Sequence, residues 1–213
     1  MKNKVKKVIK ILKEKYGEPE VTLNYNNPFE LLIAVILSAQ CTDKRVNIVT
    51  KELFKVCNSP SDFVKISQDE LERLIKSTGF YKNKSKNIKK CAKQIIKSYD
   101  GKVPDTREKL VKLAGVGRKT ANVVLGHIFN KPAIPVDTHV KRLSRLIGLT
   151  KANTPEKIEQ DLMEITAKKD WFLLSNLLIT HGRNICKARR PNCKECCIRK
   201  YCNYGGENDK QVI

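Results

Sequence analysis

The apolar residues of this chain recur at helical spacing from one end to the other. Near the start, Val5, Val8, Ile9 and Leu12 fall three or four positions apart, and Gly17 ends the segment. The same spacing predicts further helices at about 28–39, 43–57, 68–78, 82–99, 105–113, 118–129, 140–147, 155–167 and 170–183. Alternating β-branched stretches bounded by hairpin turns are lacking. The sequence therefore predicts an all-α fold.

Polar residues mark several of the predicted helix starts. Ser67, followed by Glu70, fits a capping box, and Asp105, followed by Glu108, resembles a second N-terminal cap. The proline-containing stretch 130–135 is the candidate connection between two halves of the chain.

Lysine and arginine outnumber the acidic residues by 43 to 22, which gives the 213-residue chain a net charge of +21. Such a charge attracts polyanions, so nucleic acid is the leading partner, and a solvated lysine-rich surface is the alternative. The length suits one domain or two small interleaved ones. No secretory signal is visible, and the longest apolar run, 31–37, is too short to span a membrane. We therefore expect a soluble, intracellular protein, in the cytoplasm or on the nucleoid, with no membrane partner.

A tight glycine turn, Gly115-Val116-Gly117, separates two of the predicted helices. Its two glycines permit positive φ and leave backbone N–H groups bare at the start of the next helix. Bare N–H groups and the helix dipole bind a phosphate without reading base sequence. A plain helix–turn–helix corner has the same short pattern, so the turn alone does not decide between the two.

Lys119 and Asp137, both of which follow this turn in the sequence, are candidate catalytic residues. Lys119 lies two positions past the turn, and Asp137 follows eighteen positions later. Neighbouring cations and the helix N-terminus disfavour a protonated amine at Lys119, and a neutral amine attacks carbon to form a Schiff base. A carboxylate at Asp137 would deprotonate that amine or stabilise positive charge on a sugar. The alternatives are a surface charge for Lys119 and a helix N-cap for Asp137.

The C-terminal region holds five of the eight cysteines, and four of these thiols form a compact pattern: Cys186, Cys193, Cys196 and Cys202. This spacing suits an iron–sulfur cluster ahead of zinc, which usually takes two separated Cys-x2-Cys pairs. Disulfides and free thiols are the remaining alternatives, and Cys197 is a rival to Cys196 as a ligand. Cations between the ligands, including Lys187 and Arg190, indicate a phosphate-binding surface or else offset the charge of the cluster.

Together these motifs resemble the endonuclease III family of helix-hairpin-helix-GPD DNA glycosylases. The resemblance covers nearly the whole chain. Its residues are, in order, 38–43 (SAQCTD), 78–81 (TGFY), the glycine turn with Lys119, 136–139 (VDTH), 181–183 (HGR) and the four-cysteine spacing.

The resemblance implies two lobes with a DNA groove between them. A six-helix barrel domain would cover residues 21–131 and would include a helix-hairpin-helix motif at about 105–130. Residues 1–20 and 132–213 would form a helical iron–sulfur domain with a cluster loop at 186–202. We expect the protein to be a monomer.

The resemblance also implies a reaction on double-stranded DNA that contains damaged bases or abasic sites. Lys119 would attack C1′ of a flipped-out nucleotide, displace an oxidised pyrimidine and form a Schiff base that allows β-elimination of the 3′ phosphate. Asp137 would assist Lys119 and stabilise the sugar cation. The four cysteines would hold a [4Fe–4S] cluster with a structural and DNA-binding role. The chain would thus be a bifunctional DNA N-glycosylase and abasic-site lyase of base excision repair.

Further DNA contacts follow from the same resemblance. Gln40 matches a position that fills the gap left by the flipped nucleotide, and Phe80 stands where the family places an apolar wedge, with a core contact as the alternative. Ala114 departs from the family, which usually has proline there, and should loosen the turn slightly. The expected DNA-binding set is Gly115, Val116, Gly117, Gln40, Phe80, His139, Lys187 and Arg190.

Two other functions stay open from the residues alone. A monofunctional mismatch glycosylase would release a base without cutting the strand, and such relatives generally lack a lysine at the position of Lys119. A non-catalytic metal-containing DNA-binding module would bind DNA in a salt-sensitive way and form no product.

Overall fold

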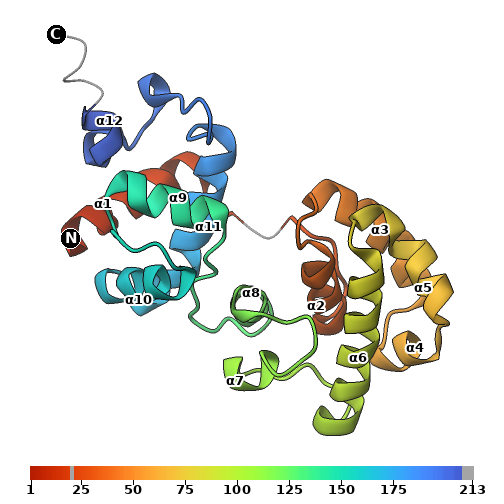
Figure 1. The fold of residues 1–213 in the computed structure, drawn as a ribbon. Coiled ribbons are helices and arrows are strands. Elements are labelled where there is room, and N and C mark those ends of the chain that lie inside the picture. Colours follow the sequence, from red (N-terminus) through yellow and green to blue (C-terminus); the bar gives the residue numbers. More distant parts are fainter. Residues whose placement is uncertain (20–21, 208–213) are drawn as a thin grey trace. The chain divides into compact units, whose positions relative to one another are not determined.

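The computed structural model describes residues 1–19 and 22–207. These residues form helices joined by turns and contain no strand, so the all-α prediction is confirmed (Figure 1). The chain divides into two compact units. Residues 21–131 form one, here called the central unit, and residues 1–20 together with 132–213 form the other, the terminal unit. No described helix is both long enough and apolar enough to cross a membrane.

The central unit is built around a helix that is buried on nearly every side. Pro28–Leu37 (α2) buries nine of its ten residues and packs against α3, α6 and α8. Its start is well defined, because the Asn27 side chain accepts the Glu30 N–H and a proline occupies the first turn. The other elements of this unit are α3 (Asp43–Val56), α4 (Pro60–Lys65), α5 (Gln68–Ile75), the short 3-10 helix η1 (Lys76–Thr78), α6 (Tyr81–Tyr99), α7 (Arg107–Leu110) and α8 (Arg118–Ile128).

The helix starts of this unit agree only in part with the sequence patterns. The Ser67 hydroxyl accepts the Glu70 N–H at 3.1 Å, as the predicted cap requires. The predicted cap at Asp105 is wrong, because α7 begins at Arg107 with Thr106 as its N-cap. The Asp105 carboxylate instead contacts the Lys131 ammonium at 2.6 Å. That contact lowers the pKa of Asp105. An exposed carboxylate beside a cation thus takes the ion pair in place of the cap.

The terminal unit joins the first helix of the chain to its last third. The apolar face of Lys2–Tyr16 (α1) buries Val5, Val8 and Leu12 completely and packs against α11. The remaining elements are α9 (Thr138–Ile147), α10 (Pro155–Ile165), η2 (Lys168–Asp170), α11 (Trp171–Asn184), η3 (Cys193–Glu195), η4 (Arg199–Tyr201) and α12 (Asn203–Glu207). One apolar core runs through α1, α9, α10 and α11, and the cysteine-containing segment packs against it.

Candidate functional site

The glycine turn joins α7 to α8 and depends on one of its two glycines. Gly115 has a φ of +78°, and a Cβ there would lie 3.0 Å from the Asn87 Cβ, so a larger residue would be strained and crowded. Gly117 has a φ of −86°, so the positive φ that the two glycines permit occurs at Gly115 and not at Gly117. A Cβ on Gly117 would meet no atom of the described structure within 4 Å. Internal packing therefore does not explain the second glycine, which suits close approach by an external group.

The backbone N–H groups of the turn are partly used inside the protein. Val116 is 5% exposed and donates its N–H to the Leu113 carbonyl at 3.1 Å. Gly117 is the N-cap of α8 and carries no side chain that could cap the helix. The first N–H groups of α8 therefore have no cap side chain to bind, which is the condition that favours an anion.

A glutamine that the sequence patterns missed supports this turn. The Gln94 side chain accepts the Ala114 N–H at 2.8 Å and donates to the Lys112 carbonyl at 3.1 Å. A proline at position 114 has no N–H to offer, so this contact depends on the departure from the family pattern. Two hydrogen bonds from α6 thus hold the turn that Ala114 was expected to loosen.

The two candidate catalytic residues belong to different units. Lys119 lies in the first turn of α8, in the central unit, and its side chain is exposed. Asp137 belongs to the terminal unit, where its Oδ1 accepts the Val140 N–H at 2.8 Å and so caps α9. The cap alternative for Asp137 is therefore present in the structure. A carboxylate accepts hydrogen bonds at two oxygens, so a cap bond at Oδ1 is compatible with chemistry at Oδ2.

His139, two residues further on, contacts its own unit. The His139 Nδ1 lies 3.3 Å from Arg142 Nη2. A Cβ on Gly182 would lie 2.7 Å from the same His139 Nδ1. Burial lowers the pKa of His139, with Arg142 and Arg183 acting in the same direction and Asp137 against them. The small residue in α11 therefore makes room for a histidine that accepts from arginine through Nδ1.

Gln40 and Phe80 have the same unusual backbone conformation. Their φ angles are +53° and +48°, in the left-handed region that is rare for residues other than glycine. Phe80 is 64% exposed, so the core-contact alternative is excluded. Gln40 is exposed as well. Both side chains are thus held outside the core of the central unit.

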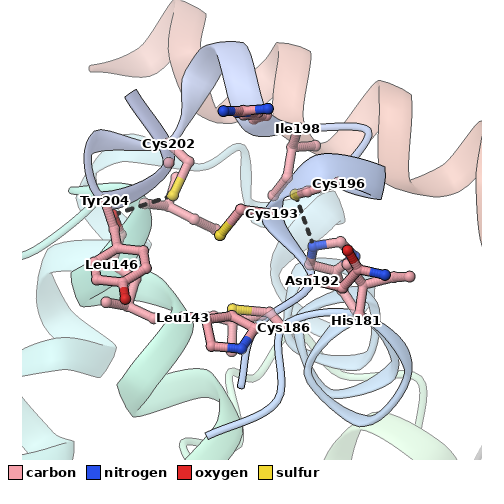
Figure 2. A pocket seen from close by; sticks show the side chains of 15 residues that line it. Leu143, Leu146, His181, Cys186, Asn192, Cys193, Cys196, Ile198, Cys202 and Tyr204 are labelled. Carbon is pink, nitrogen blue, oxygen red and sulfur yellow. Dashed lines mark hydrogen bonds between the residues drawn. The ribbon is translucent and has the colours of Figure 1, made fainter. Parts of the chain in front are cut away.

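The four cysteines of the compact pattern line one pocket of the terminal unit (Figure 2). The pocket contains about 390 Å³ of empty space, part of it open to solvent, and apolar side chains such as Leu143 and Ile198 complete its wall. Cys197 is half-buried against the core of the unit and is not among the lining residues. All eight cysteines lie in the described ranges, and none of them forms a disulfide.

A hydrogen-bonded chain ties the N-terminal helix to this pocket. The Tyr16 hydroxyl lies 2.9 Å from His181 Nδ1. His181 Nε2 in turn lies 3.4 Å from the Cys196 sulfur (Figure 2). His181 is 1% exposed, and burial lowers its pKa to about 4. Burial also raises the pKa of Cys196 to about 11. No sequence pattern predicts these hydrogen bonds, because Tyr16 and His181 are 165 positions apart along the polypeptide.

The loop between the first two pocket cysteines carries the expected cations. Lys187 and Arg190 are exposed, so both are available to a partner.

Comparison with known proteins identifies the family. Residues 33–168 match the model of the HhH-GPD superfamily of base excision DNA repair proteins. The chain is 47% identical to endonuclease III of Bacillus subtilis (strain 168) over 199 residues, which cover 93% of this chain and 91% of that protein. It is also 47% identical to endonuclease III of a Synechocystis species over 94% of this chain and 92% of that one.

Solved structures give the same result in three dimensions. A non-covalent complex of endonuclease III with DNA matches with a TM-score of 0.94 and 41% identity, over 99% of both chains. A trapped covalent intermediate of endonuclease III with DNA also has a TM-score of 0.94 and 41% identity, over 98% of this chain and 99% of that one. By sequence and by fold, this chain belongs to the endonuclease III family of the HhH-GPD superfamily.

Proposed function

We propose that the protein is a bifunctional DNA N-glycosylase and abasic-site lyase that removes oxidised pyrimidines in base excision repair. The observation that carries the proposal is an exposed lysine in the first turn of α8, directly after a glycine turn suited to phosphate. Relatives that share the fold and more than 40% of the sequence are endonucleases III, one of them trapped in a covalent intermediate with DNA.

Lys119 is the proposed nucleophile. Its uncharged amine attacks C1′ of a flipped-out deoxyribose, the bond to the base breaks, and the base leaves with a proton. The new C–N bond becomes a protonated Schiff base when the sugar ring opens. Loss of a C2′ proton then expels the 3′ phosphate by β-elimination, and hydrolysis frees the lysine.

Asp137 is proposed to assist Lys119 and to stabilise positive charge on the sugar. Asp137→Asn tests this role well, because asparagine caps helices as readily as aspartate and so keeps the bond to Val140. Turnover should fall by at least about a hundredfold, with DNA affinity changed by less than about threefold. Equal losses of turnover and affinity would reduce Asp137 to a structural cap.

The glycine turn, Gln40, Phe80, His139, Lys187 and Arg190 are the proposed DNA contacts. The turn would hold a DNA phosphate through protein backbone N–H groups. Lys187 and Arg190 would add charge-assisted contacts to other phosphates of the DNA. Gln40 and Phe80 would enter the duplex beside the flipped nucleotide.

We propose that Cys186, Cys193, Cys196 and Cys202 hold a [4Fe–4S] cluster. Their thiols line one pocket. The four cysteines are not arranged as the two separated Cys-x2-Cys pairs that zinc usually takes, and four thiolates are the ligands of an iron–sulfur cluster. The cluster would fix the shape of the basic loop and take no part in the chemistry.

Borohydride trapping tests the nucleophile. With duplexes that contain an abasic site or thymine glycol, reduction should trap a covalent protein–DNA adduct, and Lys119→Ala should abolish it. Trapping that persists in the variant would assign the nucleophile elsewhere. Base release without strand cleavage would indicate a monofunctional glycosylase, and binding without product would indicate a non-catalytic module.

A pair of neighbouring substitutions tests the cluster. Cys196→Ser should lose the broad visible absorption and the iron of the purified protein, while Cys197→Ser should keep both. A colourless wild-type protein with stoichiometric zinc would overturn the cluster, and the reverse result for the two variants would exchange their roles.

A further inference from the structure

A buried lysine in the central unit contacts both segments that carry the proposed DNA-inserting residues. Lys84 is 6% exposed, although lysine is almost never buried without partners. Its ammonium donates to the Leu37 carbonyl and to the Thr78 carbonyl, each at 2.8 Å. Burial lowers its pKa. The two carbonyls that this buried cation contacts identify the segments that it joins.

The two carbonyls end the elements that lead into Gln40 and Phe80. Leu37 is the last residue of α2, and Gln40 follows three positions later. Thr78 is the last residue of η1, and Phe80 follows two positions later. Carbonyls at helix ends lack intrahelical partners and carry the negative end of the helix dipole, so an ammonium suits them. Lysine offers three donors on a flexible stem, so one side chain can serve both.

Both segments need such support, because Gln40 and Phe80 have left-handed backbones. Residues other than glycine keep this conformation only where the surroundings fix it. Phe80 projects into solvent, so its own side chain contributes little packing to hold its backbone. The helix α6 begins directly after Phe80, and Lys84 lies in its first turn. From there the Lys84 side chain extends to the carbonyl at the end of α2.

We infer that Lys84 is a positioning residue that sets Gln40 and Phe80 in register with each other for entry into a DNA duplex. The inference rests on the proposed function, since it assumes that these two side chains enter the DNA. It adds that their relative placement is fixed before binding by one buried ammonium, so neither loop has to order itself on the DNA.

The chain offers a matched control on the same helix. Lys89 is half-buried in α6 and donates to two backbone carbonyls, those of Val64 and Ile66, at the end of α4. Burial lowers its pKa as well, and Lys93 adds to this effect. Lys89→Met therefore removes the same kind of contact from a segment that carries neither Gln40 nor Phe80.

The test compares Lys84→Met with Lys89→Met in binding to two duplexes, one undamaged and one with a stable abasic-site analogue. Lys84→Met should weaken binding to the abasic-analogue duplex by about tenfold and leave binding to the undamaged duplex within about twofold. Lys89→Met should leave both within about twofold. Thermal unfolding of both variants reports how much of any effect is general destabilisation, and Lys84→Gln, which keeps a donor, replaces Lys84→Met if that variant does not fold.

A double-mutant cycle separates positioning from a structural role. In a Gln40→Ala/Phe80→Ala background, Lys84→Met should cost less than about twofold further, because the residues it acts through are gone. A full tenfold loss in that background, or equal losses on both duplexes, would overturn the inference. If the wild-type protein neither prefers the abasic analogue nor forms the borohydride adduct, the proposed function fails; if it does both and Lys84→Met equals wild type, only the inference about Lys84 fails.

Discussion

At the scale of single residues, Gln94 bears most directly on the glycine turn. Gln94→Leu should destabilise the protein by about 1–3 kcal/mol, because the Ala114 N–H and the Lys112 carbonyl both lose their side-chain partner. The looser turn should also weaken binding to any duplex, damaged or not, since a phosphate grip carries no sequence information. Urea denaturation and DNA titration would measure the two effects.

Gln94→Glu is the control for this prediction. It keeps an oxygen to accept from Ala114 and loses the donor to Lys112, so its loss of stability should be smaller than that of Gln94→Leu. Equal losses in the two variants would mean that the bond to Ala114 contributes nothing.

His127 predicts a specific dependence of stability on pH. It lies in α8, and burial lowers its pKa from 6.5 to about 4. The unfolded chain therefore binds a proton between these values that the folded chain does not, so His127 stabilises the fold fully above pH 6.5 and this contribution is lost as the pH falls toward 4. One proton sets the maximum slope at about 1.4 kcal/mol per pH unit.

NMR titration of the three histidines would measure this pKa, and His127→Gln assigns the resonance by removing it. Over the same pH window, stability should fall less steeply in the variant than in wild type. A folded-state pKa near 6.5 would contradict the prediction.

The residue scale also shows where sequence patterns stop. The cysteine spacing indicated a metal centre but did not choose between Cys196 and Cys197, because that choice depends on which side chain the chain directs toward the pocket. Lys84 stood among many lysines, yet it shares the apolar face of its helix with Ile88 and Ala92, four and eight positions on. That helical spacing is the sequence signal that Lys84 lies on the buried side of its helix.

At the scale of elements, long helices with a clear apolar stripe could be predicted, and short ones could not. The helices α1, α6 and α11 follow from periodicity and from glycine or cap signals alone. Pro60–Lys65 (α4) was missed because it is six residues long and buries only Phe63. Two further features depend on contacts between residues far apart in sequence, which periodicity does not predict. Asp105 pairs with Lys131 and does not cap a helix, and Gln94 of α6 binds the glycine turn between α7 and α8.

The start of α4 gives a prediction at this scale. Ser59 accepts the Asp62 N–H, and the Asp62 carboxylate accepts the Ser59 N–H at 3.0 Å, which completes a capping box. Ser59→Ala should cost about 1 kcal/mol in the free energy of unfolding. Thr106→Ala is the control, because Thr106 is the N-cap of α7 but makes no side-chain cap bond in the described structure. The two variants should therefore differ in chemical denaturation, and equal losses would contradict the cap assignment.

At the scale of the whole molecule, helix packing explains why the terminal unit is assembled from both ends of the chain, with the central unit between them in sequence. The terminal unit contains the first helix and the last third of the sequence, because the apolar face of α1 finds its partner in α11. Periodicity alone predicts that face but does not name its partner, and the family resemblance implies only that residues 1–20 share a domain with residues 132–213. Composition alone gives the net charge of +21, but it does not show which of the cationic side chains contact a partner.

Salt dependence separates the net charge of the molecule from its placed charges. If Lys187 and Arg190 each neutralise one phosphate, replacing both with alanine should reduce the slope of log K against log salt by roughly 1.8, at −0.9 per phosphate. Lys168→Ala/Lys169→Ala removes the same net charge from an exposed part of the same unit. A long-range attraction to +21 would respond equally to both pairs, whereas direct contacts would respond only to the first. An unchanged slope in the Lys187/Arg190 variant would place both side chains outside the DNA interface, and the cations of the loop would then serve only to offset the charge of the cluster.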